Sequence, residues 1–464
     1  MPSGVSRKQL DSGAGHRFLW PANADDEKRS SAPPVQSFLG QCTSDSGARL
    51  EAPIHATGVS QIRFTQRSAK GTGASAPASY WLLLIFLFLL YANLPFVLPV
   101  TEVLRPAKIV AGAALAALLA EAMFGKRTLG FAWPEGSLLA GFVAVAALSC
   151  LTALWPAYAV AALSDLVKMA LVYFFIVNCA NTERRLRGVM WTIVVCGAIP
   201  AAGTLRNYLQ GNLFEGRASW LGIFANPNEV AYSLVILLPL AAVLATGAGL
   251  MPRLALLGIS TLYVGAIFVT FSRGGLVALA VVVGLYAWRK RNLWVQAALV
   301  ALVAAGLVLG GKHWSRESDF SGLKGDVTFR QRLATSEAGL AMFADHPLLG
   351  VGLGCSVIAW PLYAPKDLYS RSSLVVHNTV IQPLGETGAV GFILFAWFVG
   401  FGIYSARKLA LDASRPSMAN LGAGLEIAVW GFVVCGLSGG YLLTWFPYIL
   451  LGLVSSARRV RGES

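Results

Sequence analysis

An arginine at position 273 stands between two long apolar runs, in the stretch FVTFSRGGLVAL. A charged side chain at the centre of a bilayer costs on the order of 2.5–3.5 kcal/mol on insertion scales, so this residue needs a polar partner or water. The two glycines that follow predict a tight reversal between two helices at the membrane surface. Arg273 then either extends its charge to lipid headgroups or binds an anion, because a guanidinium matches a phosphate in bidentate geometry.

A second arginine, Arg217, precedes a helix start in the stretch GRASWLGIFANPNEVA. Asn226 is a suitable N-cap, Pro227 fits the first helical position, and Glu229 has the spacing of a capping box. Capping accounts for these three residues without a functional role. It does not account for Arg217, which is either an ordinary loop charge or a second anion-binding group.

A third polar feature lies where a long polar loop gives way to an apolar helix, in the stretch VVHNTVIQPLGETGAVGFILF. After His377, Asn378, Gln382 and Glu386 follow at four-residue steps and predict a polar stripe on one helix face. Pro383 is expected to kink this helix or to open its first turn. His377 is either a hydrogen-bonded interfacial residue or a general base that works near neutral pH.

The remaining motifs are weaker. Asp165 and Lys168 are three residues apart and are expected to form a structural ion pair on one helix face. The stretch GVGLG (350–354) is not the GxGxxG fingerprint and is interpreted as a turn, and TSEAGLAMFADHP before it predicts a short amphipathic helix. The sequence contains no Walker A motif, no Gly-x-Ser-x-Gly elbow and no carboxylate cluster suited to a divalent metal.

Membrane helices must position these residues. Of the 464 residues, 56% are hydrophobic and only 13% are charged, whereas soluble domains carry about 25% charged residues. Apolar runs long enough to cross a bilayer recur along the chain. We therefore predict an all-α polytopic membrane protein. The twelve predicted spans are 80–99, 108–124, 136–154, 159–179, 189–206, 228–246, 254–271, 275–288, 293–311, 379–404, 419–437 and 439–456.

The net charge of +14 is distributed as in a membrane protein. Lysines and arginines cluster in alternate short loops, as cytoplasmic loops do, and no basic stretch is interleaved with aromatic residues as in nucleic-acid-binding domains. Both termini are therefore predicted to be cytoplasmic. Residues 1–79 are expected to be a disordered cytoplasmic tail. A start codon assigned too far upstream would equally explain them. The other predicted parts are nine spans (80–311), a long periplasmic loop with short helices (312–378), three spans (379–456) and a cytoplasmic tail (457–464).

Four segments together resemble the O-antigen ligase and polymerase family of bacterial envelopes. They are TFSRGG (270–275), GRASWLGIFANPNEVA (216–231), RQRLATSEAGLAMFADHPLLGVGLG (330–354) and HNTVIQPLGETGAVG (377–391). The resemblance implies a GT-C-like fold in the bacterial inner membrane and a metal-independent, inverting glycosyltransferase with a periplasmic active site and no cofactor. The implied donor is a glycan on undecaprenyl diphosphate; the acceptor is lipid A–core for a ligase or a second lipid-linked glycan for a polymerase.

The resemblance also implies roles for residues. His377 would activate the acceptor hydroxyl, and Arg217 and Arg273 would bind the donor diphosphate. Arg330 or Arg332 is a further candidate for that binding. We expect Glu386 to share the catalytic site with His377. The supporting residues are expected to be Asn378, Gln382, Asp165 and Lys168.

Three alternatives to the ligase reaction are open. A polymerase of O-antigen or exopolysaccharide shares the same residues and topology, and a ligase with a protein acceptor is a rarer form. A transporter of lipid-linked sugars would have two repeated halves and charged residues near the membrane midplane. The sequence has no evident repeat of its halves, and its polar residues gather at one predicted face, so an enzyme is favoured over a transporter.

Overall fold

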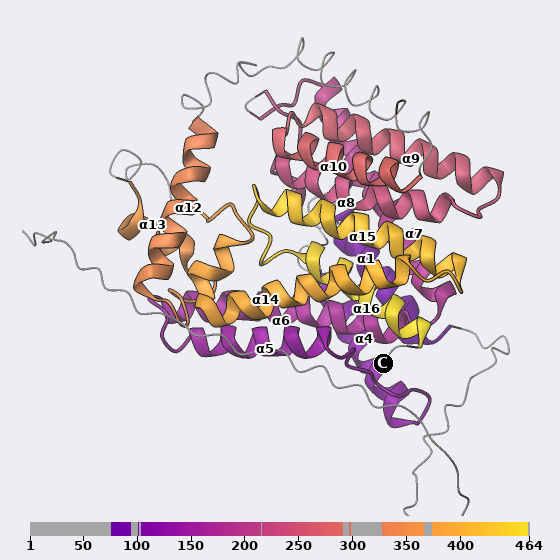
Figure 1. Ribbon diagram of the computed structural model, residues 1–464, viewed down its shortest axis with the longest axis horizontal. Coiled ribbons are helices and arrows are strands. Elements are labelled where there is room, and N and C mark those ends of the chain that lie inside the picture. The colour runs from indigo at the N-terminus through magenta and orange to yellow at the C-terminus, as the bar shows by residue number, and fades with distance from the viewer. Residues whose placement is uncertain are drawn as a thin grey trace, which may run out of the picture. The chain divides into compact units, whose positions relative to one another are not determined.

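Helices make up almost all of the regular structure in this computed structural model (Figure 1). The structure describes residues 76–93, 101, 104–214, 216–290, 297, 327–365 and 374–462. Within these ranges no β-strand is present, and Phe214 forms an isolated bridge with Arg217. Most of the predicted tail and of the predicted ninth span, and parts of the predicted long loop, lie outside the described residues.

The described helices are numbered in chain order. They are α1 (Ala78–Ala92), α4 (Pro106–Met123), α5 (Glu135–Ser149), α6 (Pro156–Cys179), α7 (Glu183–Leu209), the short 3-10 helix η1 (Gly222–Phe224), α8 (Pro227–Ala245), α9 (Leu250–Val269), α10 (Arg273–Lys290), α12 (Val327–Asp345), α13 (Ser356–Tyr363), α14 (Ile381–Ala410), α15 (Pro416–Gly436) and α16 (Trp445–Arg461). Seven of these helices are long and apolar enough to cross a membrane: α4, α6, α7, α8, α9, α14 and α15. The prediction of an all-α polytopic membrane protein is confirmed, and the count of twelve spans stays a prediction.

Proline begins four of the described helices, namely α4, α6, α8 and α15. Proline has no N–H to donate and its φ is already close to helical, so it is well tolerated at the first position. The sequence signal for these starts is therefore strong. The predicted starts of the corresponding spans lie within a few residues of the observed ones.

The central helices of the bundle are α8 and α15. Each of the helices α8, α15 and α4 contains an 18-residue apolar stretch that could cross a membrane. Of that stretch, 72% is buried in α8 and 67% in α15, against 11% in α4. α8 packs on α7, α9 and α15, α14 packs on α5 and α15, and α16 packs on α6. α4 contacts mainly α1 and is an outer helix, with most of its surface turned away from the protein.

The two ends of the bundle differ in character. At one end, which we call the cavity end, the α7–α8, α9–α10 and α15–α16 loops meet α12 and the segment before α14. At the other, the basic end, the α4–α5, α6–α7 and α14–α15 loops lie with the last turn of α16. The basic end carries the arginines and lysines of the loops predicted to be cytoplasmic.

The kink of α14 is at Gly388 and not at Pro383, so of the two effects expected of Pro383 the kink is not observed. Pro383 is the third residue of α14, in the first turn, where a missing N–H breaks no helical hydrogen bond. Gly388 has φ 67° and ψ −169°, a conformation essentially confined to glycine. A Cβ atom there would lie 2.3 Å from the carbonyl carbon of Leu348.

The reversal between α9 and α10 also differs from the prediction. The turn comes before Arg273, at Phe271, whose φ is +48°, and Gly274 and Gly275 are already inside α10. These glycines instead allow close packing, because a Cβ on Gly274 would lie 2.1 Å from the Tyr232 hydroxyl oxygen.

The last predicted span, 439–456, begins too early. α16 begins at Trp445, and residues 437–444 form an irregular segment. The helix predicted in the long loop is confirmed by α12, which ends two residues before Pro347. The stretch GVGLG is confirmed as a turn, with positive φ at Gly350, Gly352 and Gly354.

Candidate active site

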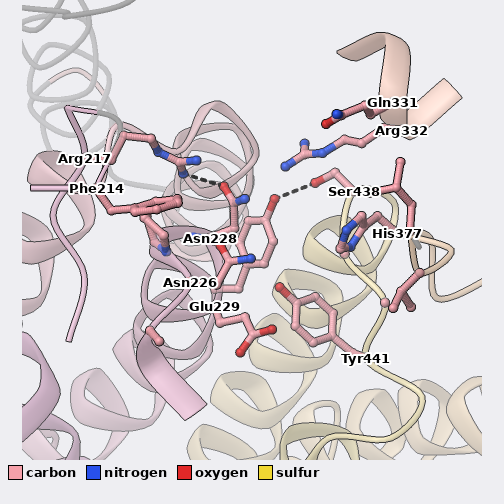
Figure 2. A pocket seen from close by; sticks show the side chains of 17 residues that line it. Phe214, Arg217, Asn226, Asn228, Glu229, Gln331, Arg332, His377, Ser438 and Tyr441 are labelled. Atoms are coloured by element: carbon pink, nitrogen blue, oxygen red, sulfur yellow. Dashed lines mark hydrogen bonds between the residues drawn. The ribbon is translucent and has the colours of Figure 1, made fainter. Parts of the chain in front are cut away.

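A cavity of about 500 Å³ opens at the cavity end of the bundle (Figure 2). Its walls come from the α7–α8 loop, the first turns of α8, the start of α12, the segment before α14 and the α15–α16 loop. The polar lining residues are Arg217, Asn226, Asn228, Glu229, Tyr232, Gln331, Arg332, His377, Ser438 and Tyr441. Two guanidinium groups, an imidazole and a carboxyl group thus share one hollow, which is a suitable setting for binding an anion and moving a proton.

Arg217 is held rigidly in one wall. It is only 6% exposed, and its Nε donates to the carbonyl oxygen of Thr270 at 2.9 Å while Nη2 donates to Asn228 Oδ1 at 2.7 Å. The backbone of Arg217 pairs with that of Phe214. Because two donors are fixed on one edge, the plane of the guanidinium is set by the protein before any ligand binds.

Asn228 joins two of the four segments that carry the family resemblance. Its Oδ1 accepts from Arg217 and also from Ser272 Oγ, at 2.8 Å. Its backbone N–H is bonded by the side chain of Asn226, which caps α8 as predicted. The segment around Arg217 and the segment TFSRGG, far apart in sequence, therefore form one hydrogen-bonded wall of the cavity.

Arg332 and His377 lie on the facing wall (Figure 2). Within the described part of the chain, the Arg332 guanidinium has no carboxylate partner. Burial of the imidazole, and after it the positive charge of Arg332, hold the pKa of His377 below its usual value. His377 is therefore neutral at pH 7 and has a lone pair with which it can accept a proton.

The position of His377 is fixed by the residue two places after it. The backbone N–H of Thr379 donates to Gly436 O at 2.7 Å, and its hydroxyl donates to Gly439 O and accepts from the Tyr441 backbone N–H. These bonds attach the segment that carries His377 to the α15–α16 loop. Any shift of that loop would therefore move the imidazole.

Three lining residues are not evident from the sequence as site residues. Glu229 has the spacing of a capping box, but Asn226 bonds Asn228 and the Glu229 carboxyl group lies on the cavity wall near Tyr441 (Figure 2). Tyr232 shares a hydrogen bond with Ser438 at 2.6 Å. Burial raises the pKa of Tyr441 well above its usual value, so its phenol stays protonated and can donate. Among these three residues only Glu229 has a signal in the sequence, as a carboxyl group in the first turn of an apolar helix.

Glu386 does not line the cavity. It is 1% exposed, and one carboxyl oxygen accepts from the backbone N–H of Gly354 at 2.9 Å while the other accepts from Ser356 Oγ at 2.6 Å and Gln382 Nε2 at 3.3 Å. Of the predicted polar stripe, Gln382 and Glu386 thus lie on one face of α14, whereas Asn378 precedes the helix. The Glu386 side chain points into the GVGLG turn and away from the cavity, so the geometry supports a structural role for Glu386 in place of the predicted catalytic one.

Like Glu386, five more of the predicted site residues lie outside the cavity lining: Asn378, Asp165, Lys168, Arg273 and Arg330. Asn378 caps α14 by accepting from the backbone N–H groups of Val380 and Ile381. Asp165 and Lys168 form the predicted ion pair at 2.7 Å, with both side chains about half exposed. Arg273 begins α10 and Arg330 lies one turn into α12. The predicted diphosphate-binding role of these two arginines stays a prediction.

Comparison with known proteins finds similarity to a protein family and to a characterised relative. Residues 258–396 match the family model described as O-antigen ligase. The match covers less than half of the chain, and it shows that this region is similar to the O-antigen ligase and polymerase family. The exopolysaccharide production protein ExoQ of Rhizobium meliloti (strain 1021) is 26% identical over 281 residues, which cover 54% of this chain and 62% of that relative. The chain thus resembles less than two thirds of ExoQ.

The family match has a clear relation to the cavity. The matched residues contain the TFSRGG segment, all of α12 and the segment with His377, so the wall with Arg332 and His377 lies within the matched region. Arg217 lies before that region, yet it bonds Thr270 directly and Ser272 through Asn228, and both residues belong to the matched region. Among the described residues, no group of three or more His, Cys, Asp or Glu side chains could hold a metal ion.

Proposed function

We propose that the chain is an inverting glycosyltransferase that transfers a glycan from undecaprenyl diphosphate to an acceptor hydroxyl in this cavity. The observation that carries the proposal is the arrangement of Arg217 and Arg332 on facing walls, with the neutral imidazole of His377 on the same wall as Arg332. Similarity to the family supports a membrane enzyme that acts on lipid-linked glycans. The details of donor, acceptor and residue roles are the proposal.

The proposed reaction is a single displacement. His377 takes the proton of the acceptor hydroxyl as the acceptor oxygen forms a bond to the anomeric carbon of the donor sugar. The bond from that carbon to the diphosphate oxygen breaks, and its electron pair leaves with undecaprenyl diphosphate. One displacement at the anomeric carbon inverts its configuration. The imidazolium then loses its proton to water.

The positive groups have two effects in this scheme. Arg217 and Arg332 stabilise the negative charge that grows on the diphosphate as it leaves, and charge-assisted bonds from guanidinium to phosphate are among the stronger hydrogen bonds in proteins. In the empty cavity Arg332 also disfavours the imidazolium form of His377. A bound diphosphate would offset that effect and make His377 a better base when the donor is in place.

Two acceptors are consistent with this chemistry. In the ligase reaction, which the description of the matched family names, the glycan would pass to lipid A–core. In the polymerase reaction it passes to a second lipid-linked glycan. The similarity to a protein named for exopolysaccharide production favours the second.

A deletion strain complemented with wild-type or variant chains tests both the role of His377 and the choice between the two acceptors. His377→Ala is expected to abolish transfer, whereas His346→Ala, which changes a histidine near the end of α12 outside the cavity, should complement fully. Full-length glycan accumulating on undecaprenyl diphosphate would indicate a ligase, and lipopolysaccharide capped by one repeat or loss of exopolysaccharide would indicate a polymerase. If the strain complemented with His377→Ala made wild-type glycans, His377 would not be the base.

A further inference from the structure

A second and larger cavity lies at the basic end of the bundle. It has a volume of about 990 Å³ and is lined by the start of α1, the end of α4, the α4–α5 loop, the α6–α7 loop, the first turn of α7 and one residue of α16. α7, which runs for 27 residues from this end to the cavity end, separates it from the candidate active site by its whole length, about 40 Å. We call it the basic pocket.

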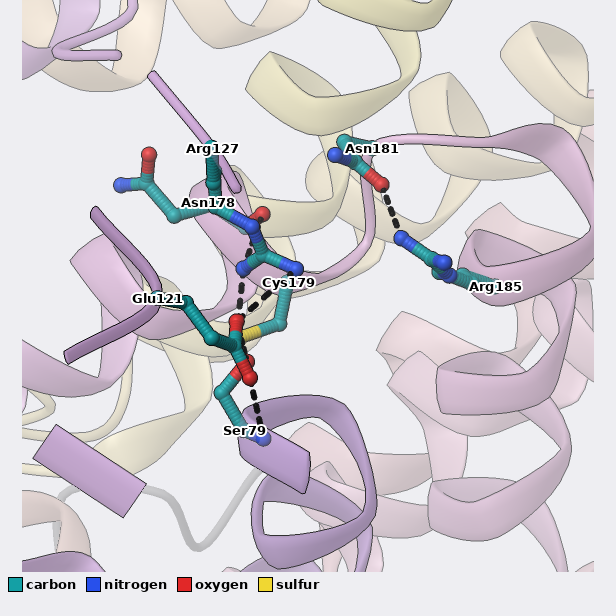
Figure 3. Close-up of polar contacts among 7 residues, drawn as sticks. All are labelled: Ser79, Glu121, Arg127, Asn178, Cys179, Asn181 and Arg185. Carbon is teal, nitrogen blue, oxygen red and sulfur yellow. Dashed lines mark hydrogen bonds and ion pairs between the residues drawn. The ribbon is translucent and has the colours of Figure 1, made fainter. Parts of the chain in front are cut away.

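Four cationic side chains line the basic pocket, namely Lys126, Arg127, Arg185 and Arg459, against the single carboxylate of Glu121. Glu121 is already committed, because it accepts from the backbone N–H and hydroxyl of Ser79 at 3.0 and 2.7 Å and pairs with Arg127 at 3.4 Å (Figure 3). The carboxylate therefore compensates one of the four charges at most.

The other cations are positioned by neutral groups. Arg185 Nη1 donates to Asn181 Oδ1 at 2.8 Å, and its guanidinium carbon lies 6.0 Å from the centre of the Tyr80 ring. Arg459 Nη1 donates to Val177 O at 3.1 Å. Within the described residues neither has a carboxylate partner. Bonds of this kind orient a guanidinium without neutralising its charge, as an anion site requires.

The loop over the pocket is built to admit Arg459. Asn178 accepts from the backbone N–H of Gly130 at 2.8 Å and donates to its carbonyl oxygen at 3.1 Å, which fixes the α4–α5 loop over the end of α6. A Cβ atom on Gly130 would lie 1.9 Å from Arg459 Nη2. Any larger residue at position 130 would force this guanidinium to shift.

The pocket also has an apolar edge. Ala117, Ala120 and Phe124 line it from the end of α4, the outer helix whose spanning window is only 11% buried, and the Phe124 side chain is 77% exposed. A cluster of cations next to the apolar surface of an outer membrane helix matches the amphipathic chemistry of a phospholipid, whose phosphate lies at the surface and whose chains extend along the helix.

We propose that the basic pocket binds the phosphate headgroup of an anionic phospholipid from the surrounding membrane. The acyl chains of that lipid lie along α4. This proposal does not depend on the glycosyl transfer proposed for the other end of the bundle.

The test uses the purified full chain in nanodiscs of phosphatidylcholine alone or with phosphatidylglycerol, with thermal unfolding and lipid retention as readouts. Phosphatidylglycerol is expected to stabilise the wild type. Arg185→Gln should weaken its binding about fivefold, since each cation near an anionic membrane surface contributes about that factor. The matched control is Arg253→Gln, an exposed arginine in the first turn of α9 that does not line the pocket.

Three results would overturn the proposal: equal effects of the two lipids on the wild type, equal losses in the two arginine variants, or full stabilisation by inorganic phosphate without anionic lipid. The last result would assign the pocket to a soluble anion. Should Arg185→Gln fail to fold in phosphatidylcholine, Lys126→Gln is the second variant, because Lys126 is exposed and its removal breaks no buried contact. The same fivefold loss is expected from it.

Discussion

Substitution of Glu386 separates a structural carboxyl group from a catalytic one. Three donors converge on it, from the end of the α12–α13 turn, the start of α13 and α14 itself, at 2.9, 2.6 and 3.3 Å. Glu386→Ala would leave the Gly354 N–H, the Ser356 hydroxyl and the Gln382 amide without their acceptor. Glu386→Gln would keep one acceptor oxygen for Ser356 and Gln382, but its amide N–H groups would then face the N–H of Gly354.

The magnitudes follow from the number of donors that lose their acceptor. A buried donor without a partner costs about 1–3 kcal/mol. Glu386→Gln leaves one such donor and should destabilise the fold by about 1–3 kcal/mol, and Glu386→Ala leaves three and should cost about 3–9 kcal/mol. The melting temperature should therefore fall in the order wild type, Gln, Ala.

The assay compares thermal unfolding of the purified full chain with transfer activity per folded molecule. Both Glu386 variants should keep kcat within a few-fold of wild type at temperatures where they are folded. His377→Ala should show the opposite pattern, with an unchanged melting temperature and no transfer. Glu337→Gln, which changes an exposed carboxyl group on α12, is the control and should change neither quantity. A wild-type melting temperature with a kcat reduced more than a hundredfold in Glu386→Gln would refute the structural role.

Three further predictions concern the base, the helix kink and metal ions. Because Arg332 lowers the pKa of His377, Arg332→Gln should raise it, so the acidic limb of the kcat/KM profile should move to higher pH; an unmoved limb would exclude His377 as the titrating base. Gly388→Ala should reduce the yield of folded protein strongly, at a cost of at least about 1–3 kcal/mol from the backbone conformation alone. Gly400→Ala on the same helix, where a Cβ meets nothing within 4 Å, should be neutral in the same detergent-extraction assay, and equal yields would contradict the steric argument. EDTA should leave transfer by the purified chain unchanged if the arginines supply the positive charge, and loss of activity restored by added Mg²⁺ would contradict that role.

Much of the candidate site could be predicted from local sequence. His377 is recognisable from a short segment, and Arg217 is conspicuous because no capping motif explains it. Arg332 was predicted only through the family resemblance, as an alternative to Arg330. Their convergence on one cavity was expected only because the loops of an alternating membrane topology meet at the same face. Glu229 and Tyr441 were missed for a physical reason. A carboxyl group in the first turn of a helix has a sufficient local explanation, and Tyr441 lies in a stretch apolar enough to be assigned to a span.

The sequence by itself determined the class of protein and most of its helices. Apolar length, proline at helix starts and the alternation of basic loops are properties of the chain that act over a few residues, so they can be recognised without a fold. Only the tertiary structure decided which polar group each helix face meets. Periodicity places Glu386 on one face of α14, but the Gly354 N–H that it bonds is 32 residues away, and Arg217 is held by Thr270, 53 residues away. The side chain that a buried polar group bonds depends on how distant segments pack, and that packing turned Glu386 toward the loop and Glu229 toward the cavity.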